Sequence, residues 1–238
     1  MRESSLQSTQ YRRTVVVDIE TVTLDPNLAK GALDALTGRI VCIGMLIDDG
    51  AQLEELTITH ENEVHILTKF WATIRPTDVI VGHNVHEFDL PFIRQRSWIL
   101  GIRPSRTIDL RKFYTADVWD SMQVWSNWAF KKFVSLDALG TALQCGQKSA
   151  HGMDVAQWWA IRDLQAIAQY CLGDVRLTYL VYCKMTYQEP RLNKPHTEVQ
   201  QARTSTVERI LSVAATRGRV TRKTRIQPMS PRVENVPL

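Results

Sequence analysis

The segment from Arg13 to Glu20 restricts the fold more than any other part of the chain. It contains a run of four β-branched residues, Thr14-Val15-Val16-Val17, whose stiff side chains favour a strand over a helix. Two acidic residues, Asp18 and Glu20, follow at a spacing of two. Because side chains alternate along a strand, both carboxylates are expected on one face, at the end of the strand.

The rest of the first 187 residues continues as strands and then helices. Further strands are predicted over 39–48 and 52–59, and the turn signal Asp48-Asp49-Gly50-Ala51 joins them as a hairpin. Apolar spacing becomes helical after Glu61. Later elements are a short buried strand at 78–81, a helix at 88–100, a strand at 107–110 and helices up to Tyr187. This order predicts an α/β fold, a mixed sheet covered by helices.

Charge divides the chain into two parts. Residues 1–187 carry 19 Lys and Arg against 21 Asp and Glu, whereas residues 188–238 carry 10 against 4. We therefore predict one folded domain over 1–187 and a basic C-terminal tail over 188–238. Within the tail, 205–214 predicts one short helix that docks on the domain or on a protein partner. The cations of 217–225 fit either substrate binding or a solvated end.

Several classes of protein are excluded by composition. The longest apolar runs are far shorter than the roughly 20 residues that cross a bilayer, so no membrane partner is expected. The polar amino terminus does not resemble a secretory signal, and the expected location is cytoplasmic. The four cysteines lack a CxxC spacing, which favours reduced packing thiols over a disulfide framework or a zinc site.

Two more acidic motifs accompany the carboxylates of the first strand. One is Gly82-His83-Asn84-Val85-His86-Glu87-Phe88-Asp89, which follows a buried strand and places Asp89 in the first turn of a helix. The other places Tyr170 and Asp174 four residues apart, on one face of a helix. Each motif alone also fits an ordinary structural role: a solvated strand end, a helix-dipole charge, or a tyrosine beside a surface aspartate.

Together the three motifs resemble the DEDD superfamily of 3′-to-5′ exonucleases, most closely the predicted exonucleases similar to the proofreading domain of family B DNA polymerases. Asp18-Ile19-Glu20 matches the first motif, Asn84 to Pro91 the second, and Tyr170 to Asp174 the third, which is of the tyrosine type. Order and spacing agree over residues 13–187, and the tail lies outside the resemblance. Further matching pieces are Ile108-Asp109-Leu110, Ser135-Leu136-Asp137-Ala138-Leu139, and Lys148 before Gly152-Met153-Asp154-Val155.

This resemblance implies a ribonuclease-H-like fold in which three antiparallel strands are extended by two parallel ones. It implies a metal-dependent 3′-to-5′ exonuclease, a hydrolase that releases nucleoside 5′-monophosphates. Two divalent ions, Mg²⁺ or Mn²⁺, are expected, because two-metal sites cleave phosphodiesters. Asp18 is assigned to both ions, Glu20 and Asp174 to the nucleophile-side ion, and Asp89 to the other ion. Tyr170 is expected to orient the attacking water.

The substrate is less defined than the chemistry. Thr21, Asn84 and Phe88 are candidates for binding the terminal sugar, positioning the strand and stacking on a base, although Phe88 also fits a core position. Single-stranded DNA is favoured over RNA, but the same carboxylates would serve a 3′-exoribonuclease. A nucleic-acid-binding or assembly subunit without a catalytic purpose is the third alternative, which the complete acidic set argues against.

Other conspicuous residues have simpler explanations. His83 and His86 lack a third soft ligand, and Lys148 fits either a phosphate contact or a solvated lysine. The aromatic residues of 112–133, interleaved with lysines, favour a helical hairpin that buries its rings over a surface that stacks on nucleic-acid bases. Trp158 and Trp159 are assigned to packing.

Overall fold

The computed structural model describes residues 12–25, 27–28, 30–148 and 154–192. The chain divides into two units, Met1–Arg191 and Leu192–Leu238, and the fold below is that of the first. The short helix at 205–214 and the basic cluster at 217–225 lie outside the described residues, so they stay predictions. Among the described residues, no helix is both long enough and apolar enough to span a membrane.

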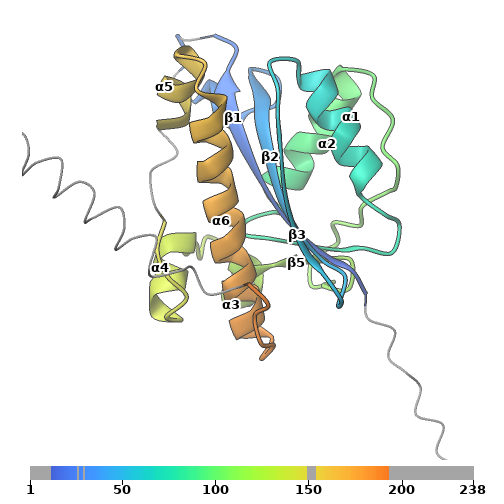
Figure 1. The fold of residues 1–238 in the computed structure, drawn as a ribbon, viewed down its shortest axis with the longest axis vertical. Coiled ribbons are helices and arrows are strands. Elements are labelled where there is room, and N and C mark those ends of the chain that lie inside the picture. The colour runs from blue at the N-terminus through green and yellow to red at the C-terminus, as the bar shows by residue number, and fades with distance from the viewer. Residues whose placement is uncertain (1–11, 26, 29, 149–153, 193–238) are drawn as a thin grey trace, which may run out of the picture. The chain divides into compact units, whose positions relative to one another are not determined.

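A five-stranded mixed sheet forms the centre of the domain (Figure 1). Its strands are β1 (Thr14–Thr23), β2 (Gly38–Asp48), β3 (Leu53–Thr59), β4 (Val79–Gly82) and β5 (Val118–Asp120). In the order β3-β2-β1-β4-β5, the first three strands pair antiparallel, while β4 and β5 add parallel. The predicted α/β architecture, with three antiparallel strands extended by two parallel ones, is confirmed.

The position predicted for the fifth strand is wrong. Residues 107–110 form no regular element, and β5 begins eight residues after them, at Val118. Ile108 and Leu110 pack against the core from an irregular segment, so their apolar pattern reflects burial without strand pairing. A strand of three residues is too short to leave an alternating pattern of its own.

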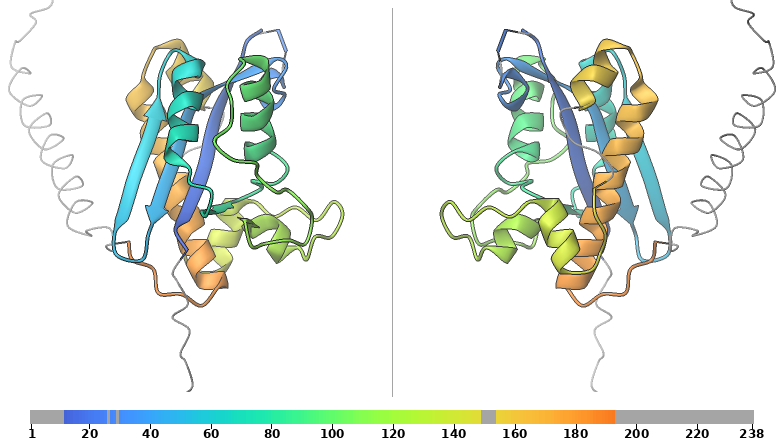
Figure 2. Two further views of the ribbon diagram at one scale, coloured as in Figure 1. Left: turned by 90° about the vertical axis from the view of Figure 1, so that its right-hand side faces the viewer. Right: turned by 90° about the vertical axis from the view of Figure 1, so that its left-hand side faces the viewer.

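Helices cover both faces of the sheet (Figure 2). They are α1 (Glu63–Thr73), α2 (Asp89–Ile99), α3 (Ser121–Trp125), α4 (Leu136–Ala142), α5 (Asp154–Ala160) and α6 (Leu164–Met185), with a short 3₁₀ turn at Gly31–Leu33. Figures 1 and 2 show α1 and α2 on one side of the sheet and the long α6 on the other. The helical spacing after Glu61 corresponds to α1, and the helix predicted at 88–100 is confirmed within one residue at each end.

The alternation of β1 separates two apolar clusters. Val15, Val17 and Ile19 pack with residues of α1 and α2, whereas Val22 packs with Tyr170 and Cys171 of α6. Asp18 and Glu20 have the same parity as Val22, so they lie on the α6 side. The predicted packing role of Trp158 and Trp159 is confirmed, because both are partly buried against this second cluster.

Residues 112–133 do not form the helical hairpin that the sequence favours. Within this segment only α3 is helical, and several aromatic side chains are exposed instead of buried, namely Phe113, Tyr114, Trp125, Phe130 and Phe133.

The four cysteines are free thiols, as predicted.

Gly44 of β2 allows α6 to approach the sheet closely. It pairs with Asp18 of β1, and a Cβ atom there would lie 2.8 Å from Cys171 Sγ and 2.9 Å from Val175 Cγ2. Real Cβ atoms do not come this close to neighbouring atoms, and both of these neighbours are short side chains that cannot swing away. The missing side chain therefore sets the distance between β1 and the residues of α6.

We expect Gly44→Ala to lower the free energy of unfolding by about 1–3 kcal/mol, because the methyl group overpacks the α6 interface. Chemical denaturation measures this loss. In Gly44→Ala/Cys171→Ala, deletion of Sγ makes room for the methyl group, so the double variant should cost less than the sum of the single variants. Additive costs would show that Gly44 does not set this contact.

Candidate active site

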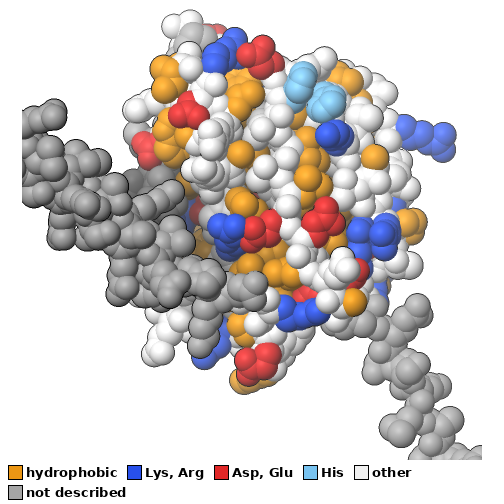
Figure 3. All heavy atoms as spheres, viewed as in Figure 1, with side chains coloured by type: hydrophobic (Ala, Val, Ile, Leu, Met, Phe, Trp, Pro, Cys, Tyr) orange, Lys and Arg blue, Asp and Glu red, His pale blue; other side chains and the backbone are white. Residues whose placement is uncertain are grey.

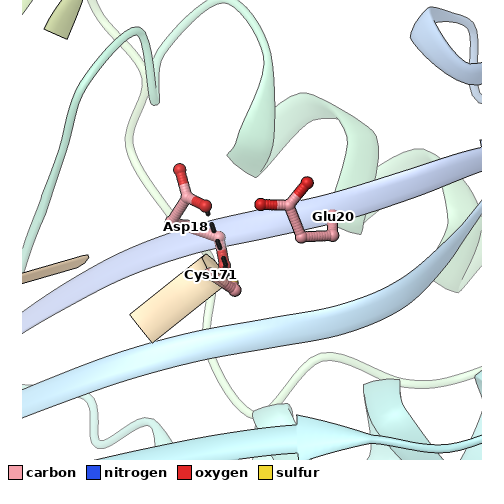
Figure 4. A group of neighbouring side chains, drawn as sticks. All are labelled: Asp18, Glu20 and Cys171. Carbon is pink, nitrogen blue, oxygen red and sulfur yellow. Dashed lines mark hydrogen bonds between the residues drawn. The ribbon is translucent and has the colours of Figure 1, made fainter. Parts of the chain in front are cut away.

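Asp18 and Glu20 lie in the middle of β1. The prediction from the sequence, which placed them at the end of the strand, is wrong in this respect. The strand runs on to Thr23, but β4 pairs with it only over Thr14–Val16. A register shift in the β1–β2 pairing follows directly after Glu20. Ligand atoms of Asp18, Glu20 and Cys171 all lie within 4.8 Å of one another, and Figure 4 shows the two carboxylates on the same side of the strand. The expected convergence of these two side chains is therefore present.

Asp89 lies at the edge of β1, beyond the residues that pair with β4. It is the first residue of α2, and its Oδ1 accepts a hydrogen bond of 3.0 Å from the backbone N–H of Ile19. This bond attaches the second acidic motif to the first, between Asp18 and Glu20. Burial raises the pKa of Asp89 to about 7, although the bond from Ile19 acts in the opposite direction.

Helix α6 supplies Tyr170 and Asp174 from the other side, together with a cation that the sequence left undecided. Lys148 Nζ lies 2.5 Å from Asp174 Oδ2 and 5.3 Å from the centre of the Tyr170 ring. The backbone N–H of Lys148 donates to Asp137 of α4 at 2.9 Å. The interpretation of Lys148 as a solvated lysine is therefore wrong.

Burial and mutual repulsion dominate the electrostatics of this cluster. Burial is the largest cause that raises the pKa values of Asp18 and Glu20 well above their usual range, and the charges of the neighbouring carboxylates add to it. Burial also raises the pKa of Asp174, which Lys148 partly offsets. Hard divalent cations prefer such oxygen donors, so the four carboxylates fit the binding of Mg²⁺ or Mn²⁺.

Cys171 is a neighbour of the cluster that sequence analysis missed. Its Sγ lies 3.4 Å from the backbone oxygen of Asp18 and 3.6 Å from Oδ2 of the same residue. Burial raises the pKa of this thiol, so it stays protonated and donates to Asp18. Its position directly after Tyr170 was the available signal, but a small apolar residue on a helix stripe gives no hint of this contact.

The three candidate substrate-binding residues have different surroundings. The Thr21 hydroxyl donates to Ala32 O at 2.7 Å. Asn84 has a left-handed φ of 62° and a buried side-chain oxygen without a hydrogen-bond partner. Phe88 is half-buried against the core and lies 5.6 Å from the ring of Phe92. All three flank the carboxylates in sequence, and their contact with a substrate stays a prediction.

A buried carboxylate at the end of β5 supports the loop before Asp89. Asp120 accepts hydrogen bonds from the backbone N–H groups of Asn84 and His86, at 3.0 Å and 2.9 Å. Burial alone would raise its pKa, but the His86 ring and these N–H groups lower it. Sequence analysis missed Asp120 because it expected the last strand elsewhere, although an acidic residue before a short helix is a capping signal.

Both histidines of this loop contact the segment that follows β5. The His83 ring lies between Ser121 Oγ and Val134 O, at 2.8 Å and 2.9 Å. The His86 ring packs edge-on against Trp128, with 5.0 Å between ring centres.

Comparison with known protein families gives a match over most of the chain. The family model described as a predicted 3′-5′ exonuclease related to the exonuclease domain of PolB matches residues 33–221. The chain belongs to this family. The match includes Asp89, Lys148, Tyr170 and Asp174, whereas Asp18 and Glu20 precede it. It also extends into the tail that the sequence placed outside the resemblance.

The fold of this PolB-related exonuclease family member is also found in a solved structure, that of the family B DNA polymerase from the hyperthermophilic archaeon Pyrobaculum calidifontis. The two share 21% sequence identity with a TM-score of 0.57, over 74% of this chain. The chain spans only 24% of the polymerase chain. This likeness confirms the ribonuclease-H-like fold. No curated protein sequence matches the chain.

The raised carboxylate pKa values predict a pH-dependent stability in the absence of metal. Between about pH 4, the ordinary carboxyl value, and about pH 7, the value for Asp89, the folded protein binds more protons than the unfolded chain. The free energy of unfolding in EDTA should therefore fall as the pH rises through this window. Mg²⁺ should raise the melting temperature more at high pH than at low pH, because it binds the ionised carboxylates.

The isosteric Asp89→Asn variant serves as the control. It cannot ionise but keeps a side-chain oxygen for the Ile19 N–H, so it should reduce the pH dependence measured in EDTA. An equal pH dependence of stability in both proteins would contradict the raised pKa of Asp89.

Proposed function

We propose that the protein is a metal-dependent 3′-to-5′ exonuclease that hydrolyses the terminal phosphodiester of single-stranded DNA and releases nucleoside 5′-monophosphates. The observation that carries the proposal is the convergence of four carboxylates from β1, α2 and α6 around the edge that β4 leaves. Membership of the exonuclease family supports the reaction type. The likeness to a DNA polymerase favours DNA over RNA.

The carboxylates would hold two divalent ions, with Asp18 shared between them. When bound, such ions supply an activated water and stabilise the charge on the phosphate and on the leaving oxygen. The protein contributes a set of oxygen donors on rigid elements. Only one nearby cation, Lys148, offsets their charge among the described residues, so the site retains a strong preference for added positive charge.

Tyr170 and Lys148 act as a pair beside Asp174. Burial raises the pKa of Tyr170 above its usual value, so its hydroxyl remains protonated and can orient a water without becoming the base. Burial alone would lower the pKa of Lys148, but hydrogen bonds with Asp174 and Tyr170 raise it, so Lys148 stays charged. Lys148 therefore holds both side chains in place and keeps a positive charge next to the reacting phosphate.

Asp18→Asn should lower kcat by more than about a hundredfold, because it removes the shared ligand. The assay uses 3′-labelled and 5′-labelled DNA and RNA strands of matched sequence, in Mg²⁺, in Mn²⁺ and in EDTA. We expect release of the 3′ label as a mononucleotide from DNA, and no release in EDTA.

Glu54→Gln is the matched control, since it neutralises an exposed carboxylate of β3 outside the site. Activity that persists after complete metal removal would contradict the mechanism, and full activity of Asp18→Asn would contradict the site. Faster release from RNA would replace DNA by RNA as the substrate, and binding without release would indicate a non-catalytic subunit.

Tyr170→Phe should lower kcat roughly a hundredfold, the usual size of a lost general-catalysis contact. The variant removes one hydroxyl and retains the ring, which lies 5.8 Å from the ring of Trp158. Steady-state kinetics at saturating metal measure the effect, with circular dichroism to verify folding. An unchanged kcat would make Tyr170 a packing residue.

A further inference from the structure

The segment that contains β5 carries exposed aromatic rings and projects from the domain. We call residues 111–134 the aromatic lobe; Figure 2 shows this green segment projecting from the body. The exposed fractions are 73% for Phe113, 47% for Trp125, 87% for Phe130 and 75% for Phe133. None of these side chains takes part in the carboxylate site.

The lobe exposes rings, whereas its larger aliphatic side chains are buried or half-buried. Val118 and Met122 are buried, and Val124 is half-buried. Protein–protein interfaces are also enriched in aromatic side chains, but they are depleted in lysine, which accompanies the rings here. Selective exposure of flat rings fits a ligand that has flat faces of its own, as nucleic-acid bases do.

Positive charge accompanies the rings. Lys112, Lys131 and Lys132 are exposed, and Lys131 Nζ lies 5.2 Å from the centre of the Phe130 ring. No acidic residue occurs between Asp120 and Asp137. On the face of the domain in Figure 3, by contrast, acidic and basic side chains are interspersed. The lobe therefore combines stacking surfaces with cations that attract phosphate.

Packing connects the lobe to the loop that precedes Asp89. His83 bonds to Ser121 and Val134, at the two ends of the segment that carries Phe130 and Phe133. Trp128 contacts His86 on one side and Phe113 on the other, at 5.0 Å and 5.5 Å between ring centres. The lobe is therefore the surface next to a nucleic-acid strand whose 3′ end lies at Asp89.

The backbone of the lobe is held in an uncommon conformation. Trp128 and Lys131 have left-handed φ values of 58° and 59°, which residues other than glycine, asparagine and aspartate rarely adopt. Contacts such as the bond from Trp128 N–H to Gln123 O, at 2.9 Å, maintain it. Strained backbone of this kind is concentrated at functional sites.

We propose that the aromatic lobe binds single-stranded nucleic acid upstream of the 3′ end, with its exposed rings stacked on bases and its lysines on phosphates. This inference rests on the proposed function, because it assigns the lobe to the substrate of the same site. The stacking is tolerant of sequence, since every base offers a flat face.

The test measures binding by fluorescence anisotropy, with Asp18→Asn in every protein so that the strand is not consumed. Two probes are used, a roughly 16-nucleotide oligothymidylate and an abasic strand of the same length. Phe130→Ala/Phe133→Ala should weaken binding of oligothymidylate roughly tenfold and leave binding of the abasic strand nearly unchanged. Phe130→Tyr/Phe133→Tyr retains the rings and should bind like the parent protein.

Tyr187→Ala is the matched control, because it removes an aromatic side chain that is 98% exposed outside the lobe. Equal binding of oligothymidylate by the parent and the double alanine variant would overturn the inference, and so would equal weakening on both probes. If the wild-type chain releases no mononucleotide from the 3′ end, the proposed function fails. If the wild type releases mononucleotides but the variant binds as the parent does, the role proposed for the lobe is rejected and the proposed function stands.

Discussion

Repulsion among the carboxylates of β1, α2 and α6 is the constraint that the rest of the structure has to balance. Elsewhere in the described part of the domain, buried acidic groups have partners: Arg96 bonds to Glu63 at 2.7 Å, and Arg13 bonds to Asp78 at 2.6 Å. At the site, four carboxylates share one lysine. The apolar packing on both faces of the sheet must hold these groups together against a cost that a divalent cation would remove.

Close contact between α6 and the sheet determines which carboxylates can meet. Gly44 lies opposite Asp18 in the β1–β2 pairing and under Cys171 of α6, so one missing side chain brings two of the acidic motifs together. The remaining motif, which contains Asp89, joins them because β4 ends early and leaves the Ile19 N–H free to bond to Asp89. The site is thus a consequence of strand length and helix approach, which no single motif encodes.

Sequence patterns predicted most of the fold and the acidic part of the site, because both depend on local regularities. The β-branched run of β1, the hairpin at Asp48 and the helical spacing of α1 each report on neighbouring residues. The fifth strand, by contrast, was predicted at 107–110 but lies at Val118–Asp120. Its position depends on which segment pairs with the free edge of β4. Lys148 and Cys171 likewise gained their roles through tertiary contacts with Asp174 and Asp18.

The failure of the helical-hairpin prediction for 112–133 has the same origin and a functional consequence. A pattern of rings and lysines shows that a segment can pack or can bind, but the choice depends on what else covers it. Here Asp120 accepts bonds from the backbone of both the 83–88 loop and α3, at Asn84 and Met122. One buried carboxylate therefore fixes both α3, inside the aromatic lobe, and the loop that leads to Asp89, so that the geometry of the lobe is coupled to the geometry of the site.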